Sequence, residues 1–281
     1  MCSLFAHLTV SFMTFVIISA SVSTTVGSEK APRNMLFVPK IEAHSYYELG
    51  YRQGKIFLLH YRNLLSVCKF VFGGITKDVK RIVQRHKKIL EERYPGFLER
   101  IKGLADSLNE TEDVLIAYEL FLSCIPSACT ITGVTRNVTK DNQRYLSWNL
   151  DLPLVYKPLF SRYFRPPPIV ICELEGKYRY VEVSVLPSIF GFGLLNEKGL
   201  TCVYAMVISN DKGEGLTPLE LNHLAMETCS NVDEVKMIFE KNERESGLIS
   251  PLTAFGLTAT LSSIWSDSSG RLMLVEYNHS T

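Results

Sequence analysis

The residues best suited to chemistry in this sequence are a cysteine, Cys129, and a carboxylate, Asp151. Each lies in a segment with the residue pattern of a β-strand, and the polar stretch Thr-Lys-Asp-Asn-Gln between them has the composition of a turn. A thiol has a reference pKa of about 8.5, so it is a poor nucleophile at neutral pH unless a neighbouring base takes its proton. We therefore predict a hairpin with a nucleophile on one strand and a carboxylate on the other. The competing interpretation is a buried structural Cys129 with Asp151 as a turn residue.

The segment ACTITGVTRNVTKDNQRYLSWNLDLP resembles the start of the mature chain in a group of N-terminal-nucleophile (Ntn) hydrolases. This group comprises the choloylglycine hydrolases, acid ceramidases and penicillin acyltransferases (peptidase C45-like). In these enzymes a Cys-Thr pair opens the first strand and an Asn-x-Asp element lies on the partner strand. The matching positions here are Cys129, Thr130, Asn149 and Asp151.

Two further stretches agree with this resemblance. SYYELGYRQGKIF, at residues 45–57, is similar to the pro-segment helix of the penicillin acyltransferase branch. NEKGLTC, at residues 196–202, resembles a turn of the choloylglycine hydrolases. The resemblance therefore implies an α+β protein with an Ntn-hydrolase αββα sandwich, preceded by a mostly helical pro-segment.

The resemblance also implies that the precursor cuts its own chain between Ala128 and Cys129. The new α-amino group of Cys129, with a reference pKa of about 8, would then serve as the base for its own thiol. Asp151 would hold that amino group, and Asn149 either contributes to an oxyanion site or only shapes the hairpin. The implied reaction is hydrolysis of an N-acyl amide or lipid amide, or acyl transfer from it, through an acyl-thioester on Cys129, with no cofactor and no metal.

Two positions depart from the pattern of the group. An ungapped extension of the match places Met206, which cannot donate a hydrogen bond, at the position of the oxyanion asparagine. Asn210 is the candidate substitute, although loop capping explains it equally well. The chain also ends at Thr281, before the positions of another catalytic asparagine and an arginine. Either the gene product is C-terminally incomplete or the enzyme is impaired, so the alternative function is a secreted, catalytically inactive relative that acts as a ligand-binding or interaction module.

Several features indicate a secretory-pathway address. An apolar stretch from Leu8 to Val22, followed by small residues, predicts a signal peptide over residues 1–27. The stretch is shorter than the roughly 20 residues that a membrane anchor needs. Asn-x-Ser/Thr triplets at Asn109, Asn137 and Asn278 are candidate glycosylation sites. We therefore expect a secreted or lysosomal glycoprotein.

Composition restricts the class of protein further. The chain of 281 residues is 46% hydrophobic and 21% charged, which is typical of one compact globular unit. Lys+Arg 30 balance Asp+Glu 29, so no basic surface indicates nucleic acid as a partner. If Cys2 leaves with the signal peptide and Cys129 is a thiol, an odd number of cysteines remains, which excludes a dense disulfide scaffold. The expected partner is a small-molecule amide, with the pro-segment packed on the catalytic chain.

The elements that must position the site follow from local patterns. A capping box at Ser45 and Glu48 predicts a helix start. Apolar periodicity predicts helices from Val79 to near Pro95 and from Thr111 to Leu122, with His86 as a packed core residue. A short strand is expected over residues 35–38.

Beyond Cys129 the chain has mostly strand patterns. Caps at Thr217 and Asn231 predict a pair of helices in this part. The predicted strands are residues 129–137, 144–152, 169–175, 178–186, 201–209, 259–267 and 271–278. We therefore expect a signal peptide (residues 1–27), a pro-segment (residues 28–128) and a catalytic chain (residues 129–281).

Overall fold

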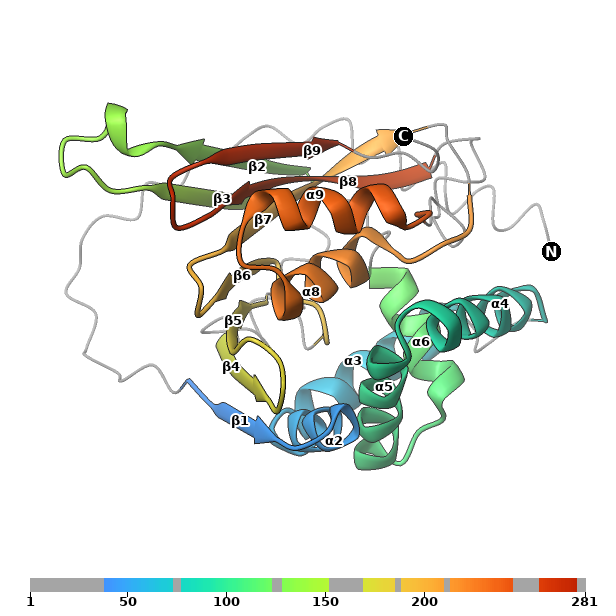
Figure 1. Ribbon diagram of the computed structural model, residues 1–281. Coiled ribbons are helices and arrows are strands. Elements are labelled where there is room, and N and C mark those ends of the chain that lie inside the picture. The colour runs from blue at the N-terminus through green and yellow to red at the C-terminus, as the bar shows by residue number, and fades with distance from the viewer. Residues whose placement is uncertain are drawn as a thin grey trace, which may run out of the picture.

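The computed structural model describes residues 38–72, 77–122, 128–151, 169–184, 188–209, 213–244 and 258–276. Within these residues the protein is mixed α+β, with seven α-helices and two β-sheets (Figure 1). The helices are α2 (Tyr46–Ile56), α3 (Leu58–Phe72), α4 (Lys77–Arg93), α5 (Pro95–Leu108), α6 (Glu112–Leu122), α8 (Pro218–Thr228) and α9 (Val232–Lys241).

The strands form one large sheet and one hairpin. They are β1 (Lys40–Ala43), β2 (Ala128–Val134), β3 (Tyr145–Asp151), β4 (Ile169–Leu174), β5 (Tyr180–Val183), β6 (Gly193–Asn196), β7 (Thr201–Ser209), β8 (Thr258–Ser266) and β9 (Leu272–Glu276). The large sheet has the order β1-β4-β5-β6-β7-β8-β9, and β2 pairs with β3 in the second sheet. All described pairs are antiparallel except β1 with β4, which is parallel.

The two faces of the large sheet carry different layers. On one face, Trp265 of β8 meets Phe239 of α9, with ring centroids 6.3 Å apart. The adjacent residue Ile264 points to the other face, because successive side chains of a strand alternate. There a Cβ on Gly133 of β2 would lie 3.0 Å from Ile264 Cγ2, so the hairpin packs directly on the sheet. The described residues therefore form three layers: hairpin, large sheet and helices. The outer helix layer that an αββα sandwich requires over the hairpin is not found among them.

The first helices are held together by glycines. A Cβ on Gly50 of α2 would lie 1.9 Å from the carbonyl oxygen of Arg100 in α5. A Cβ on Gly103 of α5 would likewise lie 1.9 Å from the carbonyl oxygen of Tyr47. The two helix backbones are thus in direct contact, and this contact fixes where the side chain of Arg100 enters the core.

The hydrophobic core is shared by both sides of the Ala128–Cys129 bond. Leu49 and Phe97 belong to the same buried cluster as Cys202 and Trp265. Strand β1, which precedes that bond in the chain, completes the edge of the large sheet beside β4. The segment before Cys129 is therefore an integral part of the fold.

The predicted helix starts are confirmed. Ser45 Oγ accepts the Glu48 N–H at 3.1 Å, Thr217 forms a capping box with Glu220, and Asn231 caps α9. The predicted strands are matched by β2 to β5 and β7 to β9. The expected strand over residues 35–38 lies mostly outside the described residues, and the observed strand begins at Lys40.

Helix α5 and strand β6 were not predicted. The signal peptide, Asn210 and Asn278 lie outside the described residues. None of the described helices has the length and apolarity needed to cross a membrane.

Candidate active site

The predicted hairpin between Cys129 and Asp151 is confirmed. Cys129 pairs with Leu150, and Ala128 pairs with Asp151. The polar stretch between the strands turns through Asn142, whose φ of 55° is a left-handed conformation that asparagine tolerates. The register brings the backbone of Asp151 to the peptide bond between Ala128 and Cys129; the Asp151 side chain lies outside the described part.

Cys129 lies on the inner face of the hairpin. Gly133 packs on the large sheet, and Cys129 is an even number of residues away on the same strand, so both point inward. Cys129 is partly exposed, whereas Thr130 and Thr132 on the outer face are exposed. The thiol therefore lies in the space between the two sheets, at the start of β2.

Asn149 lies on the outer face of the hairpin. It pairs with Thr130 and is exposed. The structure therefore does not bring the side chains of Asn149 and Cys129 together. Met206 of β7 pairs with Leu261 and, by alternation from Val203 and Ile264, lies on the helix-covered face of the large sheet.

The hairpin is anchored on the large sheet by contacts along its length. Trp148 of β3 stacks on Phe192, with ring centroids 5.3 Å apart. Near the turn, Arg144 Nη1 donates to Ser266 Oγ at 3.5 Å. Together with the contact between Gly133 and Ile264, these interactions hold the strand that carries Cys129 in place.

Cys129 differs from the other described cysteines in its environment. Cys172, Cys202 and Cys229 are buried thiols. Burial raises the pKa of Cys172 and Cys202, and raises the pKa of Cys229 to about 11, so these sulfurs stay protonated at neutral pH. Among these four cysteines, whose side chains the structure describes, Cys129 is the partly exposed one, as a nucleophile requires.

The two histidines that are buried in the described part of the chain are engaged elsewhere in the core. His86 Nε2 lies 2.8 Å from Glu220 Oε1, which confirms the prediction of a packed core histidine. His223 Nε2 accepts the Gly191 N–H at 3.1 Å, and burial holds its pKa well below the usual value, so it stays neutral. Neither histidine is placed to act as a general base for the Cys129 thiol.

A buried polar network lies where the first helices meet the large sheet, and the sequence analysis missed it. Arg100 is completely buried. Its Nη2 donates to Gln53 Oε1 at 2.7 Å and lies 3.4 Å from Glu182 Oε1, and its Nη1 donates to the Tyr180 hydroxyl at 2.9 Å. The partners come from α2 and β5, so no local sequence pattern could have indicated them.

Further carboxyl groups extend this network. Burial raises the pKa of Glu182 to about 7, against the opposing charge of Arg100. Burial also raises the pKa of Glu119 to about 8, although Glu119 accepts hydrogen bonds from the Ser188 hydroxyl at 2.7 Å and the Ile189 N–H at 3.2 Å. These groups join α2, α5 and α6 to the sheet, and we interpret them as structural.

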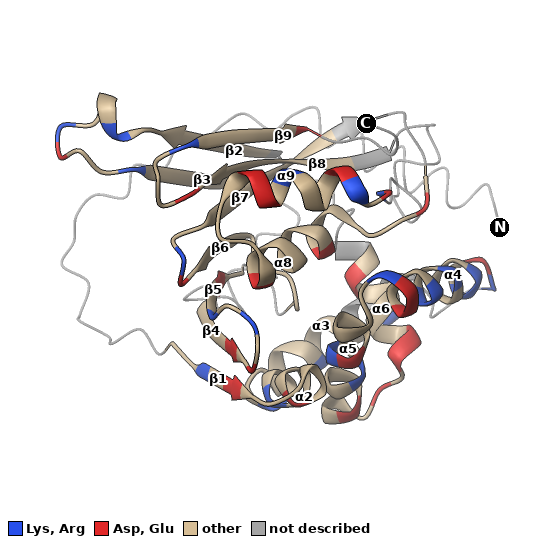
Figure 2. Cartoon of the chain, viewed as in Figure 1, with Lys and Arg blue, Asp and Glu red and all other residues tan. Residues whose placement is uncertain are grey.

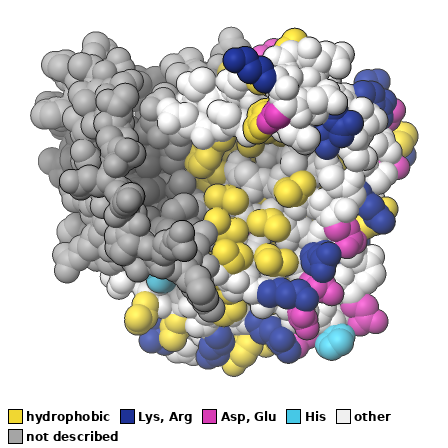
Figure 3. Space-filling view, turned by 90° about the vertical axis from the view of Figure 1, so that its left-hand side faces the viewer, with side chains coloured by type: hydrophobic (Ala, Val, Ile, Leu, Met, Phe, Trp, Pro, Cys, Tyr) yellow, Lys and Arg dark blue, Asp and Glu magenta, His cyan; other side chains and the backbone are white. Residues whose placement is uncertain are grey.

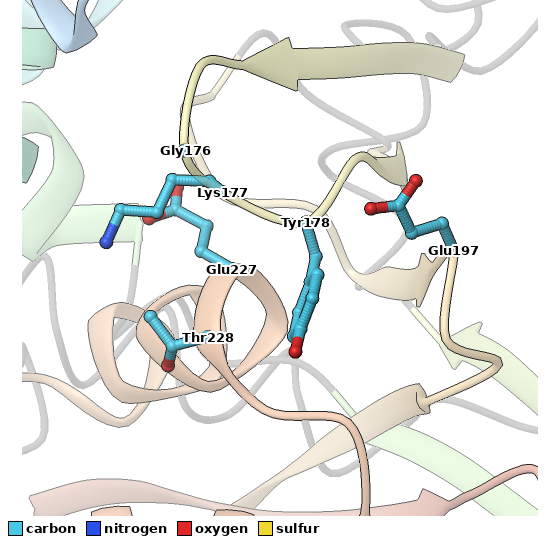
Figure 4. A pocket seen from close by; sticks show the side chains of 6 residues that line it. All are labelled: Gly176, Lys177, Tyr178, Glu197, Glu227 and Thr228. Atoms are coloured by element: carbon cyan, nitrogen blue, oxygen red, sulfur yellow. The ribbon is translucent and has the colours of Figure 1, made fainter.

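A cavity of about 440 Å³ lies between the β4–β5 turn and the end of α8 (Figure 4). Its lining residues are Gly176, Lys177, Tyr178, Glu197, Glu227 and Thr228. The carboxylate of Glu227 accepts hydrogen bonds from the hydroxyls of Tyr46 and Tyr94, so it is committed to the core. The lining includes no residue of the hairpin, so this cavity is separate from Cys129.

Part of the large sheet beside the hairpin is apolar. Val183, Gly193, Val203 and Ile264 are register partners across β5 to β8, so they share the face on which Gly133 packs. On this face Val203 is buried, whereas Val183 is partly exposed, and Leu195 is 45% exposed. Figure 3 shows the side of the molecule that lies to the left in Figure 1, with hydrophobic side chains gathered near the middle of the view.

Charges of both signs are mixed on the described surface. Figure 2 shows Lys and Arg interspersed with Asp and Glu along α4 and at β1, where Lys40 pairs with Glu173 at 2.8 Å. Among the described residues no group of His, Cys, Asp and Glu side chains is arranged to hold a metal ion. No protein-family model matches the chain, and no curated protein matches it.

Proposed function

We propose that this protein is a self-processing cysteine amidase or acyltransferase of the Ntn type, acting on an N-acyl amide through an acyl-thioester on Cys129. The observation that carries the proposal is the hairpin register. It places a partly exposed thiol on the inner face of β2 and brings the backbone of Asp151 beside the peptide bond that precedes the thiol. The sequence resemblance to the Ntn group assigns chemistry to the same two residues.

Self-cleavage is the first step of the proposed mechanism. The Cys129 sulfur attacks the carbonyl carbon of Ala128, and the Cys129 nitrogen takes a proton as its bond to that carbon breaks. Water then hydrolyses the resulting thioester, which frees the Ala128 carboxylate and restores the thiol. The product carries an α-amino group next to the nucleophile, and this group supplies the base that neither His86 nor His223 provides.

Amide turnover follows the same pattern on a second carbonyl. The α-amino group takes the thiol proton, the sulfur attacks the substrate carbonyl, and the leaving amine receives that proton. Water, or a second amine in the acyltransferase case, releases the acyl group from sulfur. We assign Asp151 the role of holding the ammonium form of the amino group.

The apolar face beside the hairpin supports an apolar acyl group in the substrate. Val183 and Leu195 lie on the same side of the large sheet as the hairpin and are not covered by it among the described residues. An acyl chain attached to Cys129 would bury its own apolar surface against such side chains, at roughly 25 cal/mol per Å². This favours fatty or aromatic acyl amides over small polar ones.

The secretory-pathway address remains part of the proposal. Asn109 adopts a left-handed conformation at the end of α5 and is exposed, and Asn137 is exposed in the β2–β3 loop. Both are thus accessible to glycan addition, one on each side of the cleavage point. A secreted or lysosomal glycoprotein fits this placement.

Mapping the cleavage tests the proposed function. Purified protein should give two fragments on a denaturing gel, the larger beginning at Cys129. Cys129→Ala should remain whole, and the control Thr132→Ala, on the outer face of the same strand, should be cut normally. If Cys129→Ala is cut at the same bond in a protease-free preparation, self-processing is wrong. An intact wild-type chain whose Cys129 does not react with acyl-directed electrophiles would instead favour the catalytically inactive binding module.

A further inference from the structure

Trp148 lies on the same inner face of the hairpin as Cys129. It pairs directly with Ile131, and Leu150, two residues further along β3, pairs with Cys129. Trp148 is therefore the diagonal cross-strand neighbour of Cys129. Such diagonal neighbours have Cα atoms about 7–8 Å apart, a distance that an aromatic side chain can span.

The indole N–H of Trp148 is a buried donor whose hydrogen bond is missing among the described residues. Its Nε1 atom is shielded from solvent and has no acceptor there. By contrast, Trp265 Nε1 donates to Ser263 Oγ at 2.8 Å. A buried donor without an acceptor lowers the stability of the folded protein by about 1–3 kcal/mol. Because this donor lies next to a nucleophile, a bound ligand is the expected source of its acceptor.

The ring that carries this donor is held rigidly. Trp148 stacks on Phe192, with planes inclined by 24°, and Phe192 stacks on Tyr204 with centroids 5.5 Å apart. The Tyr204 hydroxyl in turn donates to the Gly191 carbonyl at 2.9 Å. The stack fixes the orientation of the indole without using its N–H, as a preorganised donor requires.

We infer that the indole N–H of Trp148 donates a hydrogen bond to the carbonyl oxygen of the acyl group that Cys129 attacks. The inference rests on the proposed function and names the donor that stabilises the oxygen as it gains negative charge. The indole keeps its proton throughout, so its contribution is electrostatic. It supplies the oxyanion contact that Met206, on the other face of the large sheet, cannot provide.

Nuclear magnetic resonance of the wild-type protein can test this contact independently of amide turnover. The chain contains 2 tryptophans, so nitrogen-15 labelling of tryptophan gives one indole signal for each, and Trp148→Phe identifies which is which. Iodoacetamide adds an amide carbonyl one methylene group away from the Cys129 sulfur, whereas 1-iodopropane adds an alkyl group of similar size without a carbonyl. Mass spectrometry establishes complete modification of Cys129 in both samples.

The Trp148 indole proton should move downfield with iodoacetamide and not with 1-iodopropane, and the Trp265 signal should stay unchanged with both. Equal behaviour of the Trp148 signal with the two reagents would overturn the inference. This result does not depend on self-cleavage, so it separates failure of the inference from failure of the proposed function.

Kinetics supply the second test, with octanoyl p-nitroanilide as the substrate. Trp148→Phe keeps a ring for the stack but lacks the donor, so kcat should fall about 100-fold with little change in KM. Tyr145→Phe is the matched control, because this aromatic residue lies on the outer face of the same strand, where it bonds to Asp141. It should keep normal turnover. An unchanged kcat in folded, cleaved Trp148→Phe protein would overturn the assignment.

Discussion

Replacing Arg100 by methionine should weaken the joint between the first helices and the large sheet. The guanidinium group is completely buried, and its partners Gln53, Tyr180 and Glu182 would lose their shared donor. Methionine fills a similar volume but leaves the Glu182 carboxylate without a counter-charge. Breaking one side of a buried ion pair costs about 3–5 kcal/mol, and we expect a loss in this range at neutral to alkaline pH.

The loss should depend on pH. The pKa of Glu182 is raised to about 7 in the folded protein, mainly by burial, and the charge of Arg100 opposes this rise. A raised folded pKa means that the carboxyl group contributes stability at low pH and that this contribution is lost as pH rises through about 7. Without Arg100 the pKa of Glu182 rises further, so the variant should lose more stability at about pH 8 than at about pH 5.

Arg85→Met is the matched control for this experiment. Arg85 of α4 also pairs with a carboxylate that follows Cys129 in the chain, Glu214, but the Arg85 side chain is 54% exposed. Exposed pairs contribute about 0–1 kcal/mol, so this variant should change little. Urea unfolding of both variants and the wild type, at about pH 5 and about pH 8, gives the comparison. Equal destabilisation by the two substitutions, or a larger Arg100→Met loss at the lower pH, would refute the reasoning.

Two further predictions concern the hairpin and the helix contact. Asp151→Asn should keep the fold but lose most amide hydrolysis, because a neutral side-chain amide cannot hold the ammonium charge of the Cys129 amino group. Thermal melting and the rate of amide hydrolysis are measured on the same variant. Normal hydrolysis by a cleaved Asp151→Asn protein would show that Asp151 has only a structural role. Gly103→Ala should cost about 1–3 kcal/mol, because its Cβ would lie 1.9 Å from the Tyr47 carbonyl oxygen. Gly193→Ala, whose nearest contact would be Val183 Cβ at 4.0 Å, is the control in the same thermal melts, and equal losses would contradict the packing argument.

Local patterns were sufficient to predict most of the fold. The side chains of Ser45, Thr217 and Asn231 accept hydrogen bonds from helix N–H groups two or three residues later in the chain. The residue pattern over such a short stretch is therefore enough to predict where the helix begins. Helix α5 was missed because Pro95 was interpreted only as the end of a helix, and because Gly103 weakens a helical pattern. Its glycine has a packing role against α2 that only the assembled structure reveals.

The candidate site was predictable in part for the same reason. A hairpin between neighbouring strands brings the backbones of Cys129 and Asp151 together by local geometry, and the sequence contained both residues and the turn. The face on which each side chain lies depends on how the hairpin packs against a sheet formed much later in the chain. For this reason the outward position of Asn149 and the buried indole donor of Trp148 could not be predicted.

The parallel pairing of β1 with β4 has a consequence for the order of assembly during synthesis. Strand β1 (Lys40–Ala43) leaves the ribosome long before its partner β4 (Ile169–Leu174) exists. The helices that follow β1 can form from near neighbours, whereas this strand pair requires closing a long loop, which is intrinsically slow. Until β4 is synthesised, β1 lacks the partner strand with which it pairs in the folded protein. Because β4 follows Asp151 in the chain, the proposed cut at Cys129 would separate β1 from β4 if it came before this pairing. The proposed cleavage therefore requires that the large sheet forms first.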